Sequence, residues 1–353
     1  MKKIVLTGGG TAGHVTPNIA LLPFLKEEGF ESFYIGSYDG IEKRLIEDFS
    51  IPYYGISTGK FRRYFDLKNF SDPFRVIKGY RQTLDLLKKI QPDIVFSKGG
   101  FVSVPVVRAA ASLKIPCIIH ESDMTPGLAN KLCIPVASRV CCNFPETLKN
   151  LPASKAVLTG SPIRQELTKG NKLVALDLCG FTSNKPIVMV IGGSQGASSI
   201  NNMVREALPK LLETFQIVHI CGKDKVDNLM LTIPGYKQFE YLKSELKDVF
   251  AMADLVISRA GANAICELLA LRKPNILIPL QAGSRGDQVL NARSFEEQGF
   301  SIVLREDYLD CDILTEKIYE LYRDRQNFID KMNKSNQLNS IPTIMNLIKE
   351  LSS

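Results

Sequence analysis

One local pattern occurs twice in this chain of 353 residues: an apolar run, then a glycine-rich loop, then residues with helical spacing. The first copy comprises the run 3–7 and the loop 8–13, and the second comprises the run 187–191 and the loop 192–196. A buried strand that leads through glycines into a helix is typical of a βαβ unit with parallel strands. The repetition therefore predicts an α/β fold with two doubly wound, Rossmann-like domains that face each other across a ligand-binding cleft.

Further short apolar runs, followed by glycines or other turn residues, extend this pattern through both halves. They occupy residues 32–35, 53–56, 93–96, 117–120 and 157–159, and then 216–220, 255–258, 275–279 and 301–304. Gly160-Ser161-Pro162 interrupts the alternation, because glycine and proline punctuate regular elements. We therefore expect an N-terminal domain over residues 1–162 and a C-terminal domain over residues 163–340. A last helix, within residues 341–353, is expected to pack back on the N-terminal domain.

Composition and hydropathy exclude several classes of protein. Apolar residues make up 45% of the chain and charged residues 23%, which fits a globular protein with a sizeable core. No apolar run reaches the roughly 18 residues of a membrane span, and the first run stops at Gly8, short of the about 7–15 residues of a secretory signal. The eight cysteines form no C-x-x-C pair, and the three histidines fit no zinc motif. We therefore expect a cytosolic protein that has no metal site and needs no cofactor.

Positive charge is concentrated in residues 60–89. This segment holds nine basic and three acidic residues, which accounts for most of the formal net charge of +7. A nucleic-acid-binding protein would be expected to spread or repeat such charge. The local patch instead predicts one docking surface and no nucleic-acid partner.

The same segment contains a candidate helix, which Ser71 or Asp72 can cap and which would have Pro73 in its first turn. Its apolar residues fall on one face, and basic residues flank them: Phe74, Ile77, Tyr80 and Leu84, with Arg75, Lys78 and Arg81. An apolar stripe beside cations is what a helix lying on an anionic membrane needs. The alternative is an ordinary amphipathic helix that faces the core and solvates its basic side. The neighbouring aromatic residues Phe61, Tyr64 and Phe65 favour the membrane.

The first glycine loop allows more than one interpretation. Its G-x-G-x-x-G pattern lies between a strand and a helix, where backbone N–H groups and the helix N-terminus favour an anion. The loop could be no more than a tight βα turn, or it could bind a dinucleotide with the help of Asp39 or Glu42. His14 follows the glycines where a dinucleotide fold prefers a small residue, which weakens the dinucleotide hypothesis and makes His14 a candidate base.

Other titratable candidates lie in or after strands. His120 and Glu121 end a strand at the edge where the active sites of α/β proteins gather, so both are candidate bases. His219 lies inside an apolar strand run and is expected to belong to the core.

Polar residues at the start and within the second half have the chemistry to contact a nucleotide sugar. Ser194 can hydrogen-bond a phosphate, and it can also cap a helix. Glu267, one turn into a helix that follows 258–261, can accept hydrogen bonds from a ribose diol or merely complement the helix dipole. Gln288 can bind sugar hydroxyls or lie in a surface loop. Arg164 can neutralise a diphosphate or be a solvated surface charge.

These loops together resemble the MurG family of peptidoglycan N-acetylglucosaminyltransferases, which have the GT-B glycosyltransferase fold. The resemblance covers nearly the whole chain, and it rests on the order and spacing of several motifs. They are Gly9-Gly10-Thr11-Ala12-Gly13-His14, Gly99-Gly100-Phe101-Val102-Ser103, His120-Glu121, Gly192-Gly193-Ser194-Gln195-Gly196, Arg259-Ala260-Gly261, and Gln288 with Asn291.

The resemblance implies the transfer of N-acetylglucosamine from UDP-N-acetylglucosamine to the 4-hydroxyl of the muramoyl sugar of lipid I, which forms lipid II in peptidoglycan synthesis. It implies that the C-terminal domain binds the donor and the N-terminal domain the acceptor, undecaprenyl-diphosphate-MurNAc-pentapeptide. It also implies peripheral attachment to the anionic inner leaflet of the cell membrane, on the cytoplasmic side. The attachment face would comprise Phe74, Arg75, Ile77, Lys78, Tyr80 and Arg81.

Carried over to this sequence, the resemblance gives roles to individual residues. Thr11, Ala12, Gly13 and His14 would line the acceptor side of the cleft. Ser194 and Arg164 would meet the diphosphate, Glu267 the ribose and Gln288 the donor sugar. Asp123, Leu242, Ala262 and Asn291 complete the implied substrate-binding set. His14 would take the proton of the acceptor hydroxyl, with Glu121 as the second candidate, in a single in-line displacement.

The sequence departs from the family pattern at a few positions. Ala12 stands where the family usually has glycine, which restricts positive φ. Ser122-Asp123 replaces the usual Gln-Asn, and Phe101 replaces a frequent tyrosine. A UDP-N-acetylglucosamine 2-epimerase, or a nucleotide-binding protein without catalytic activity, remains the alternative to the transferase hypothesis.

Overall fold

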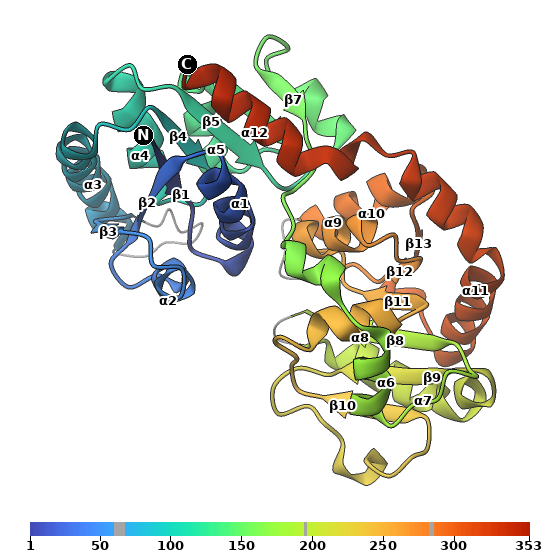
Figure 1. Cartoon of the computed structure of the whole chain (residues 1–353). Coiled ribbons are helices and arrows are strands. Elements are labelled where there is room, and N and C mark those ends of the chain that lie inside the picture. Colours follow the sequence, from blue (N-terminus) through green and yellow to red (C-terminus); the bar gives the residue numbers. More distant parts are fainter. Residues whose placement is uncertain (60–67, 194–195, 282–285) are drawn as a thin grey trace. The chain divides into compact units, whose positions relative to one another are not determined.

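The computed structural model describes residues 1–59, 68–193, 196–281 and 286–353, apart from the side chains of residues 68–73. The chain forms two compact units (Figure 1). The N-terminal unit comprises Met1–Arg164 and Asn339–Ser353, and the C-terminal unit comprises Gln165–Leu338. The chain thus passes from one unit to the other directly after Arg164, just beyond Gly160-Ser161-Pro162.

A seven-stranded parallel sheet forms the centre of the N-terminal unit, in the order β3-β2-β1-β4-β5-β6-β7. The direction of winding reverses between β1 and β4, as in doubly wound folds. The strands are β1 (Lys2–Thr7), β2 (Phe30–Ser37), β3 (Tyr53–Ile56), β4 (Ile94–Ser97), β5 (Cys117–Glu121), β6 (Arg139–Cys142) and β7 (Ala156–Leu158). The helices are η1 (Ala12–His14), α1 (Thr16–Glu27), α2 (Ile41–Glu47), α3 (Lys68–Ile90), α4 (Ser103–Ser112), α5 (Leu128–Cys133), η2 (Ile134–Val136), η3 (Pro145–Asn150) and α12 (Ser340–Leu351).

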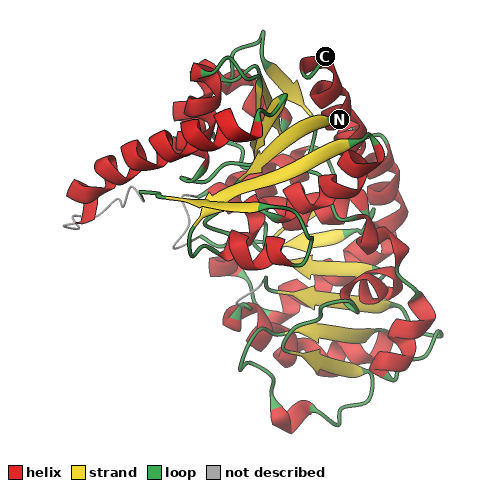
Figure 2. Cartoon of the chain, turned by 60° about the vertical axis from the view of Figure 1, so that its left-hand side comes forward, coloured by secondary structure: helices red, strands yellow, loops and turns green. Residues whose placement is uncertain are grey.

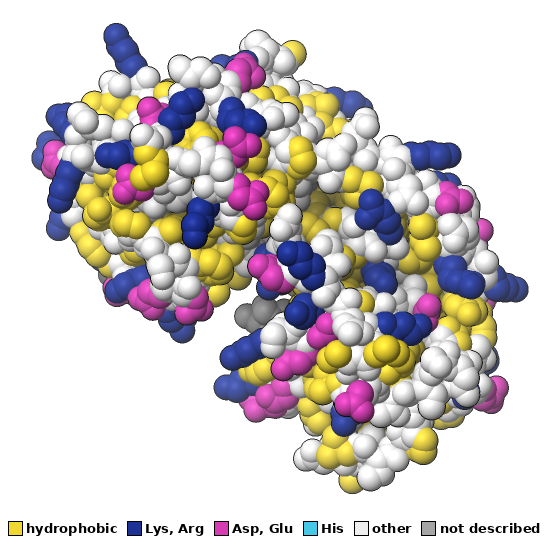
Figure 3. Space-filling model, viewed as in Figure 1, with side chains coloured by type: hydrophobic (Ala, Val, Ile, Leu, Met, Phe, Trp, Pro, Cys, Tyr) yellow, Lys and Arg dark blue, Asp and Glu magenta, His cyan; other side chains and the backbone are white. Residues whose placement is uncertain are grey.

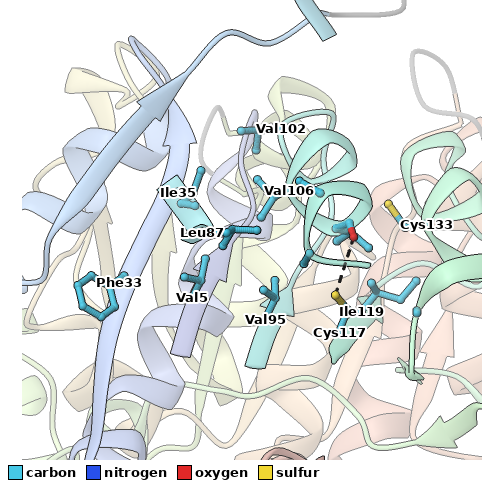
Figure 4. Packing of buried hydrophobic residues seen from close by; sticks show 14 of the residues in the cluster. Val5, Phe33, Ile35, Leu87, Val95, Val102, Val106, Cys117, Ile119 and Cys133 are labelled. Atoms are coloured by element: carbon cyan, nitrogen blue, oxygen red, sulfur yellow. Dashed lines mark hydrogen bonds between the residues drawn. The ribbon is translucent and has the colours of Figure 1, made fainter. Parts of the chain in front are cut away.

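Helices cover both faces of this sheet, because successive strand residues point to opposite sides. In β1, Val5 faces one apolar cluster, whereas Ile4 and Leu6 face the other. Figure 4 shows the first cluster, in which residues of α3, α4 and α5 pack on the strands. The second cluster is formed with α1, α2 and α12. The central strands are therefore buried on both sides, and their carboxyl ends and the loops that follow are the places left for chemistry.

The C-terminal unit repeats this architecture with a six-stranded parallel sheet, in the order β10-β9-β8-β11-β12-β13. The strands are β8 (Ile187–Ile191), β9 (Gln216–Ile220), β10 (Tyr236–Phe239), β11 (Leu255–Ser258), β12 (Asn275–Leu277) and β13 (Ser301–Val303). The helices are η4 (Gln165–Lys169), α6 (Lys172–Cys179), α7 (Ser198–Thr214), η5 (Asn228–Met230), α8 (Leu246–Met252), α9 (Ala262–Ala270), α10 (Asp287–Glu297), η6 (Glu306–Tyr308), α11 (Cys311–Asn333) and η7 (Asn336–Asn339). Apolar residues of α7 and α11 pack on one face of the sheet. The sheet reverses its winding between β8 and β11.

The last helix, α12, belongs to the N-terminal unit. Ile344 and Ile348 are buried in the cluster that α1 also lines. Ser340 Oγ donates to the carbonyl oxygen of Ser161 over 3.0 Å. The C-terminal segment is therefore part of the N-terminal core.

Helix α3 packs on the sheet through a face that the apolar spacing does not reveal. Its buried positions are Gly79, Thr83, Leu87 and Ile90. A Cβ atom at Gly79 would lie 2.0 Å from the carbonyl oxygen of Ser57, so only glycine allows this approach of α3 to the end of β3. Figure 2 shows that α3, the long helix beside the N-terminal sheet, extends beyond the edge of that sheet.

The apolar stripe predicted for α3 divides into two parts. Phe74 is 75% exposed and Ile77 is 52% exposed. Tyr80 is half-buried against the core, and its hydroxyl lies 2.8 Å from Ser112 Oγ. Leu84 also packs against the core. Tyr80 is therefore only partly exposed, because α4 covers this part of α3, and its place in the membrane-facing surface stays a prediction.

Three local expectations differ from the structure. Strands β6 and β10 were not among the expected strands; each has only four residues, and β10 is an edge strand with two adjacent polar residues in the sequence Tyr-Lys-Gln-Phe. Helix α3 begins at Lys68, so Pro73 lies beyond its first turn. The sequence could not show this, because proline in a helix costs one hydrogen bond and does not exclude a turn before it. The aromatic residues Phe61, Tyr64 and Phe65 lie outside the described residues.

All eight cysteines lie within the described part of the chain and are free thiols, seven of them buried. Among the described helices, none combines the length and apolar character needed to span a membrane.

Candidate functional site

A pocket of about 340 Å³ lies in the C-terminal unit at the carboxyl ends of β8 and β11. This is the place where the winding of the sheet reverses, and doubly wound proteins bind ligands at such switch points. The second glycine loop forms one side of the pocket, and the start of α9 forms another. Leu246, Phe250 and Leu268 contribute apolar surface. The pocket therefore offers backbone N–H groups, small residues and an apolar wall together.

Two predicted polar contacts meet in this pocket. Glu267 and Gln288 both line it, although they come from different helices, α9 and α10. Gln288 Oε1 accepts a hydrogen bond from the backbone N–H of Leu280 over 3.0 Å, which fixes the orientation of the amide. Its Nε2 group is therefore the end that can donate to a sugar hydroxyl.

The other predicted donor contacts in this unit lie around the pocket. Ala262 is the first residue of α9. Asn291 is buried on α10, and its Nδ2 lies 3.4 Å from the carbonyl oxygen of Ala260. Asn291 therefore braces the loop before α9. Leu242 is half-buried in the loop before α8 and is not part of the pocket lining.

Ser194, predicted to meet the diphosphate, lies outside the described residues, as does Gln195. The N-cap position of α7 is Ala197, which makes no side-chain cap hydrogen bond. Gly193 and Gly196, on either side, have φ values of +88° and +68°. A Cβ atom at Gly196 would lie 2.0 Å from the carbonyl oxygen of Cys221, so this end of the loop requires glycine.

Arg259 and Glu306 form a partly buried ion pair beside the pocket, which the sequence did not reveal. Arg259 Nη1 lies 2.8 Å from Glu306 Oε2, and Nη2 lies 2.9 Å from Oε1. The side chains are 11% and 24% exposed. Arg259 also donates to the carbonyl oxygen of Ile278 over 3.0 Å and to Ser199 Oγ over 3.2 Å. All four terminal N–H bonds of this guanidinium are thus engaged within the protein, and they tie the end of β11 to η6 and to the first turn of α7.

In this ion pair the hydrogen bonds from Arg259 hold the pKa of the Glu306 carboxyl below its usual range. Glu306 is therefore ionised at neutral pH and keeps Arg259 in place. A carboxylate directly after the last strand was the available sequence signal, but nothing local indicates its partner.

The first glycine loop, in the N-terminal unit, already holds a carboxylate of the protein. Glu42 is buried, and its Oε2 accepts a hydrogen bond from the N–H of Gly10 over 3.1 Å. Its Oε1 accepts from the N–H of Ser37 over 3.0 Å and from the Ser37 hydroxyl. A phosphate bound to the N–H of Gly10 would have to displace this carboxylate. The structure therefore argues against a dinucleotide at this loop, and Glu42 acts as an internal anion.

His14 lies at the end of this loop, in the short helix η1 with Ala12 and Gly13. Its Nδ1 lies 3.0 Å from the carbonyl oxygen of Gly9 and 3.3 Å from Thr11 Oγ1. A carbonyl oxygen can only accept, so Nδ1 carries the proton and the lone pair of the neutral ring is on Nε2. The ring is partly exposed. These contacts give His14 the tautomer that a general base at Nε2 requires.

His120, also predicted as a candidate base, is completely buried. Its Nε2 lies 2.9 Å from the carbonyl oxygen of Gly160 and must donate, so Nδ1 accepts from Lys98 Nζ over 2.7 Å. Lys98 is buried too, and it also donates to Ser122 Oγ over 2.7 Å. Burial, helped by the charge of Lys98, lowers the pKa of His120 well below its usual range. His120 therefore stays neutral and links three loops of the N-terminal unit.

Glu121, the second candidate base, braces the loop that follows it. Its Oε1 accepts from the N–H of Asp123 over 3.0 Å, and its Oε2 accepts from the N–H of Gly127 and from Asn130 Nδ2. Burial raises the pKa of this carboxyl. These contacts show that Glu121 holds the loop after β5 in place; its role as a base stays a prediction. Asp123 is partly exposed at the start of the braced loop.

His219 is buried in β9, as predicted. Its Nδ1 lies 2.9 Å from the Tyr236 hydroxyl, and its Nε2 lies 2.9 Å from Asn201 Oδ1. Burial lowers the pKa of His219 to about 3.

The exposed residues at the start of α3 are Phe74, Arg75, Ile77, Lys78 and Arg81. Figure 3 shows Lys and Arg side chains along the outer edge of the N-terminal unit, where Figure 1 places α3. Arg164 is half-buried at the end of this unit. No cluster of three or more His, Cys, Asp or Glu side chains suited to a metal ion occurs in the described residues.

Two doubly wound parallel sheets, with a glycine loop at each switch point and a pocket at the second, are the architecture of two-domain glycosyltransferases with the GT-B fold. Sequence comparison agrees. The Glycosyltransferase family 28 N-terminal domain matches residues 4–142, and the C-terminal domain of the same family matches residues 187–348. The chain belongs to glycosyltransferase family 28.

Similar proteins extend this result. The chain is 66% identical over 351 residues to UDP-N-acetylglucosamine--N-acetylmuramyl-(pentapeptide) pyrophosphoryl-undecaprenol N-acetylglucosamine transferase of Lachnospira eligens, with 99% of each chain covered. The crystal structure of Acinetobacter baumannii MurG aligns with a TM-score of 0.80 at 26% identity, over 99% of this chain and all of that one. UDP-GlcNAc 2-epimerase from Neisseria meningitidis aligns with a TM-score of 0.69 at 14% identity, over 99% of this chain and 100% of the epimerase chain. The last likeness concerns the fold alone.

Proposed function

We infer that this protein is the N-acetylglucosaminyltransferase that converts lipid I into lipid II. It transfers N-acetylglucosamine from UDP-N-acetylglucosamine to the 4-hydroxyl of the MurNAc-pentapeptide, a step of peptidoglycan synthesis. The full-length similarity to transferases of that name supports this function. The observation that carries it is the pocket at the switch point of the C-terminal sheet, where Glu267 and Gln288 converge.

We propose that this pocket binds the donor. The apolar wall of Leu246 and Phe250 suits the uracil ring, and the Glu267 carboxylate can accept hydrogen bonds from both ribose hydroxyls. The Nε2 group of Gln288 can donate to a hydroxyl of the donor sugar, because Leu280 holds the other end of the amide. The N–H groups of the second glycine loop suit the diphosphate. Ala262 and Asn291 support the start of α9 beside this site. The proposed contacts of Leu242, Ser194 and Arg164 with the donor rest on the family resemblance.

We propose that the acceptor binds at the first glycine loop, near Thr11, Ala12, Gly13 and Asp123, with His14 as the base. Nε2 of His14 would take the proton of the 4-hydroxyl as that oxygen attacks C1 of the donor sugar. The bond from C1 to the β-phosphate oxygen breaks in the same step, and UDP leaves with the electron pair. Backbone N–H groups can stabilise its charge. A single displacement of this kind inverts the configuration at C1.

The start of α3 is the proposed contact with the membrane. The exposed Phe74 and Ile77 can enter the interfacial region, and Arg75, Lys78 and Arg81 can pair with anionic headgroups. Lipid I presents its sugar at the cytoplasmic side of the inner leaflet, so attachment there would bring the acceptor to the enzyme. Charge reversal at the three basic residues should release the protein from anionic vesicles in a sedimentation assay. Unchanged sedimentation would contradict the proposed face.

The reaction itself is tested with labelled UDP-N-acetylglucosamine and a lipid I analogue. We expect a lipid-linked disaccharide. Release of UDP-N-acetylmannosamine, or of UDP with 2-acetamidoglucal, would indicate an epimerase instead. His14→Ala should lower kcat by about two to four orders of magnitude and leave UDP binding nearly unchanged. Normal turnover in that variant would show that His14 is not the base.

A further inference from the structure

A second pocket, of about 370 Å³, lies in the N-terminal unit at the carboxyl ends of β1, β2 and β3. It is lined by Gly10 of the first glycine loop, by the residues that follow β2 and β3, and by Arg75 of α3. It lies on the β2 and β3 side of β1, whereas the switch point lies on the other side of β1, between β1 and β4. None of the roles described above uses this pocket.

The walls of this pocket are fixed by hydrogen bonds that cross between elements. Gln82 of α3 accepts from the N–H of Ser57 over 2.8 Å and donates to the Tyr38 hydroxyl over 2.7 Å. The Tyr53 hydroxyl donates to the carbonyl oxygen of Ser37. The close contact of Gly79 with Ser57 holds α3 against the same edge. The pocket is thus a built feature of the fold.

The lining of this pocket carries both a negative and a positive charge. Asp39 offers a carboxylate and Arg75 a guanidinium, and both are exposed to a ligand. Ser57 and Thr58 add hydroxyl groups, while Ile41 adds apolar surface. The N–H of Gly10 is already bonded to Glu42, so among the described residues of this lining Arg75 is the group that can attract an anion. A ligand that carries a carboxylate, amides and an amine fits this combination better than a phosphate alone does.

The pocket lies directly beside the proposed acceptor site. His14 Nδ1 contacts the carbonyl oxygen of Gly9, and the next residue, Gly10, is part of the pocket lining. A Cβ atom at Gly10 would meet nothing within 4 Å, so the space at this residue is open. In a MurNAc-pentapeptide the peptide is attached through the oxygen next to the reacting 4-hydroxyl. The peptide must therefore leave the sugar within a few bonds of His14.

We propose that this pocket binds the peptide of the acceptor, with Arg75 facing a peptide carboxylate and Asp39 facing a peptide amine. The proposal rests on the function proposed above. It makes the N-terminal unit selective for an acceptor that carries its peptide, and it gives Arg75 a role that is independent of the membrane.

The test compares two soluble acceptors in detergent, without vesicles, so that membrane binding does not contribute. Both carry MurNAc on a short lipid diphosphate; one has the pentapeptide, and the other has only the lactyl amide. Arg75→Gln should raise the KM of the pentapeptide acceptor about two- to fivefold, as expected for an exposed charge pair, and leave the KM of the other acceptor unchanged. Arg75→Lys should restore most of the affinity. Lys88→Gln, an exposed charge change on the same helix that is not in the pocket lining, is the control.

A second comparison uses pentapeptides that carry either an amine or a methyl group on the third side chain. Asp39→Asn should raise the KM only for the amine. Equal effects of Arg75→Gln on both acceptors would overturn the proposal and assign Arg75 to the diphosphate or the sugar. An absence of any effect on either acceptor would overturn it as well. If the wild-type protein makes no disaccharide from either acceptor, the proposed function fails, which is a different result.

Discussion

Replacing Glu306 by glutamine tests whether the ion pair with Arg259 supports the donor pocket. The substitution keeps the size of the side chain and one acceptor oxygen, but it removes the charge and turns the second oxygen into a donor that faces Arg259. The pair is partly buried, with oxygen–nitrogen distances of 2.8 and 2.9 Å. Hydrogen bonds to charged groups contribute about 1.5–3 kcal/mol each. We therefore expect the C-terminal unit to lose about 1.5–3 kcal/mol of stability.

The effect should extend to the donor, because Arg259 lines the pocket and holds Ser199 next to the second glycine loop. We expect Glu306→Gln to weaken UDP binding about five- to tenfold, where tenfold corresponds to about 1.4 kcal/mol. The KM of the donor should rise by a similar factor, and kcat should change less.

Differential scanning calorimetry can measure the stability of the variant, and isothermal titration calorimetry can measure its affinity for UDP. The chain has no tryptophan, so circular dichroism is the suitable optical probe. Glu297→Gln is the matched control, since Glu297 pairs with Arg293 on the exposed face of α10 and should contribute no more than about 0.5 kcal/mol. A Glu306→Gln protein with the unfolding temperature and UDP affinity of the wild type would refute the reasoning.

Two further predictions concern stability. Gly10 and Gly100 both have φ of +84°, but a Cβ atom would meet nothing at Gly10 and would lie 2.2 Å from the carbonyl oxygen of Gly9 at Gly100. Gly10→Ala should therefore cost about 1 kcal/mol from backbone strain, and Gly100→Ala clearly more in urea unfolding; equal losses would contradict the predicted clash. Because the pKa of His219 is about 3 in the folded protein and about 6.5 when unfolded, stability is lost as the pH falls below about 6.5. The loss from this group is about 2 kcal/mol at pH 5. Between pH 8 and pH 5, the unfolding free energy of His219→Gln should change less than that of the wild type, by about that amount. An identical change in the wild type and the variant would show that His219 does not cause the loss of stability.

The architecture could be predicted from the sequence because it depends on local signals. Each apolar run followed by glycine marks a buried strand and its βα turn, and these signals recur in both halves. The missed strands lack such a signal. Strand β10, at the sheet edge, has the adjacent polar residues Lys237 and Gln238 at its centre, and β6 is a short run around two cysteines.

The candidate site was predicted less completely, because its supports act over long distances along the chain. The role of His14 could be proposed from its place after a glycine loop, but the orientation of its ring depends on the carbonyl of Gly9. Nothing near Glu306 in the sequence indicates Arg259, which lies on another strand end. Similarly, the approach of β3 that buries part of α3 depends on Gly79 and cannot be read from apolar spacing.

The carboxylate of Glu42 has a consequence for a protein whose halves are so alike. Both halves present a loop shaped to attract a negatively charged group, and a nucleotide released in one could in principle lodge in the other. In the N-terminal half Glu42 already occupies the amide of Gly10. A free nucleotide would have to compete for this amide with the Glu42 carboxylate, which is also negatively charged and is covalently part of the chain. One built-in side chain thus breaks the equivalence of two similar sites and directs the nucleotide to a single half.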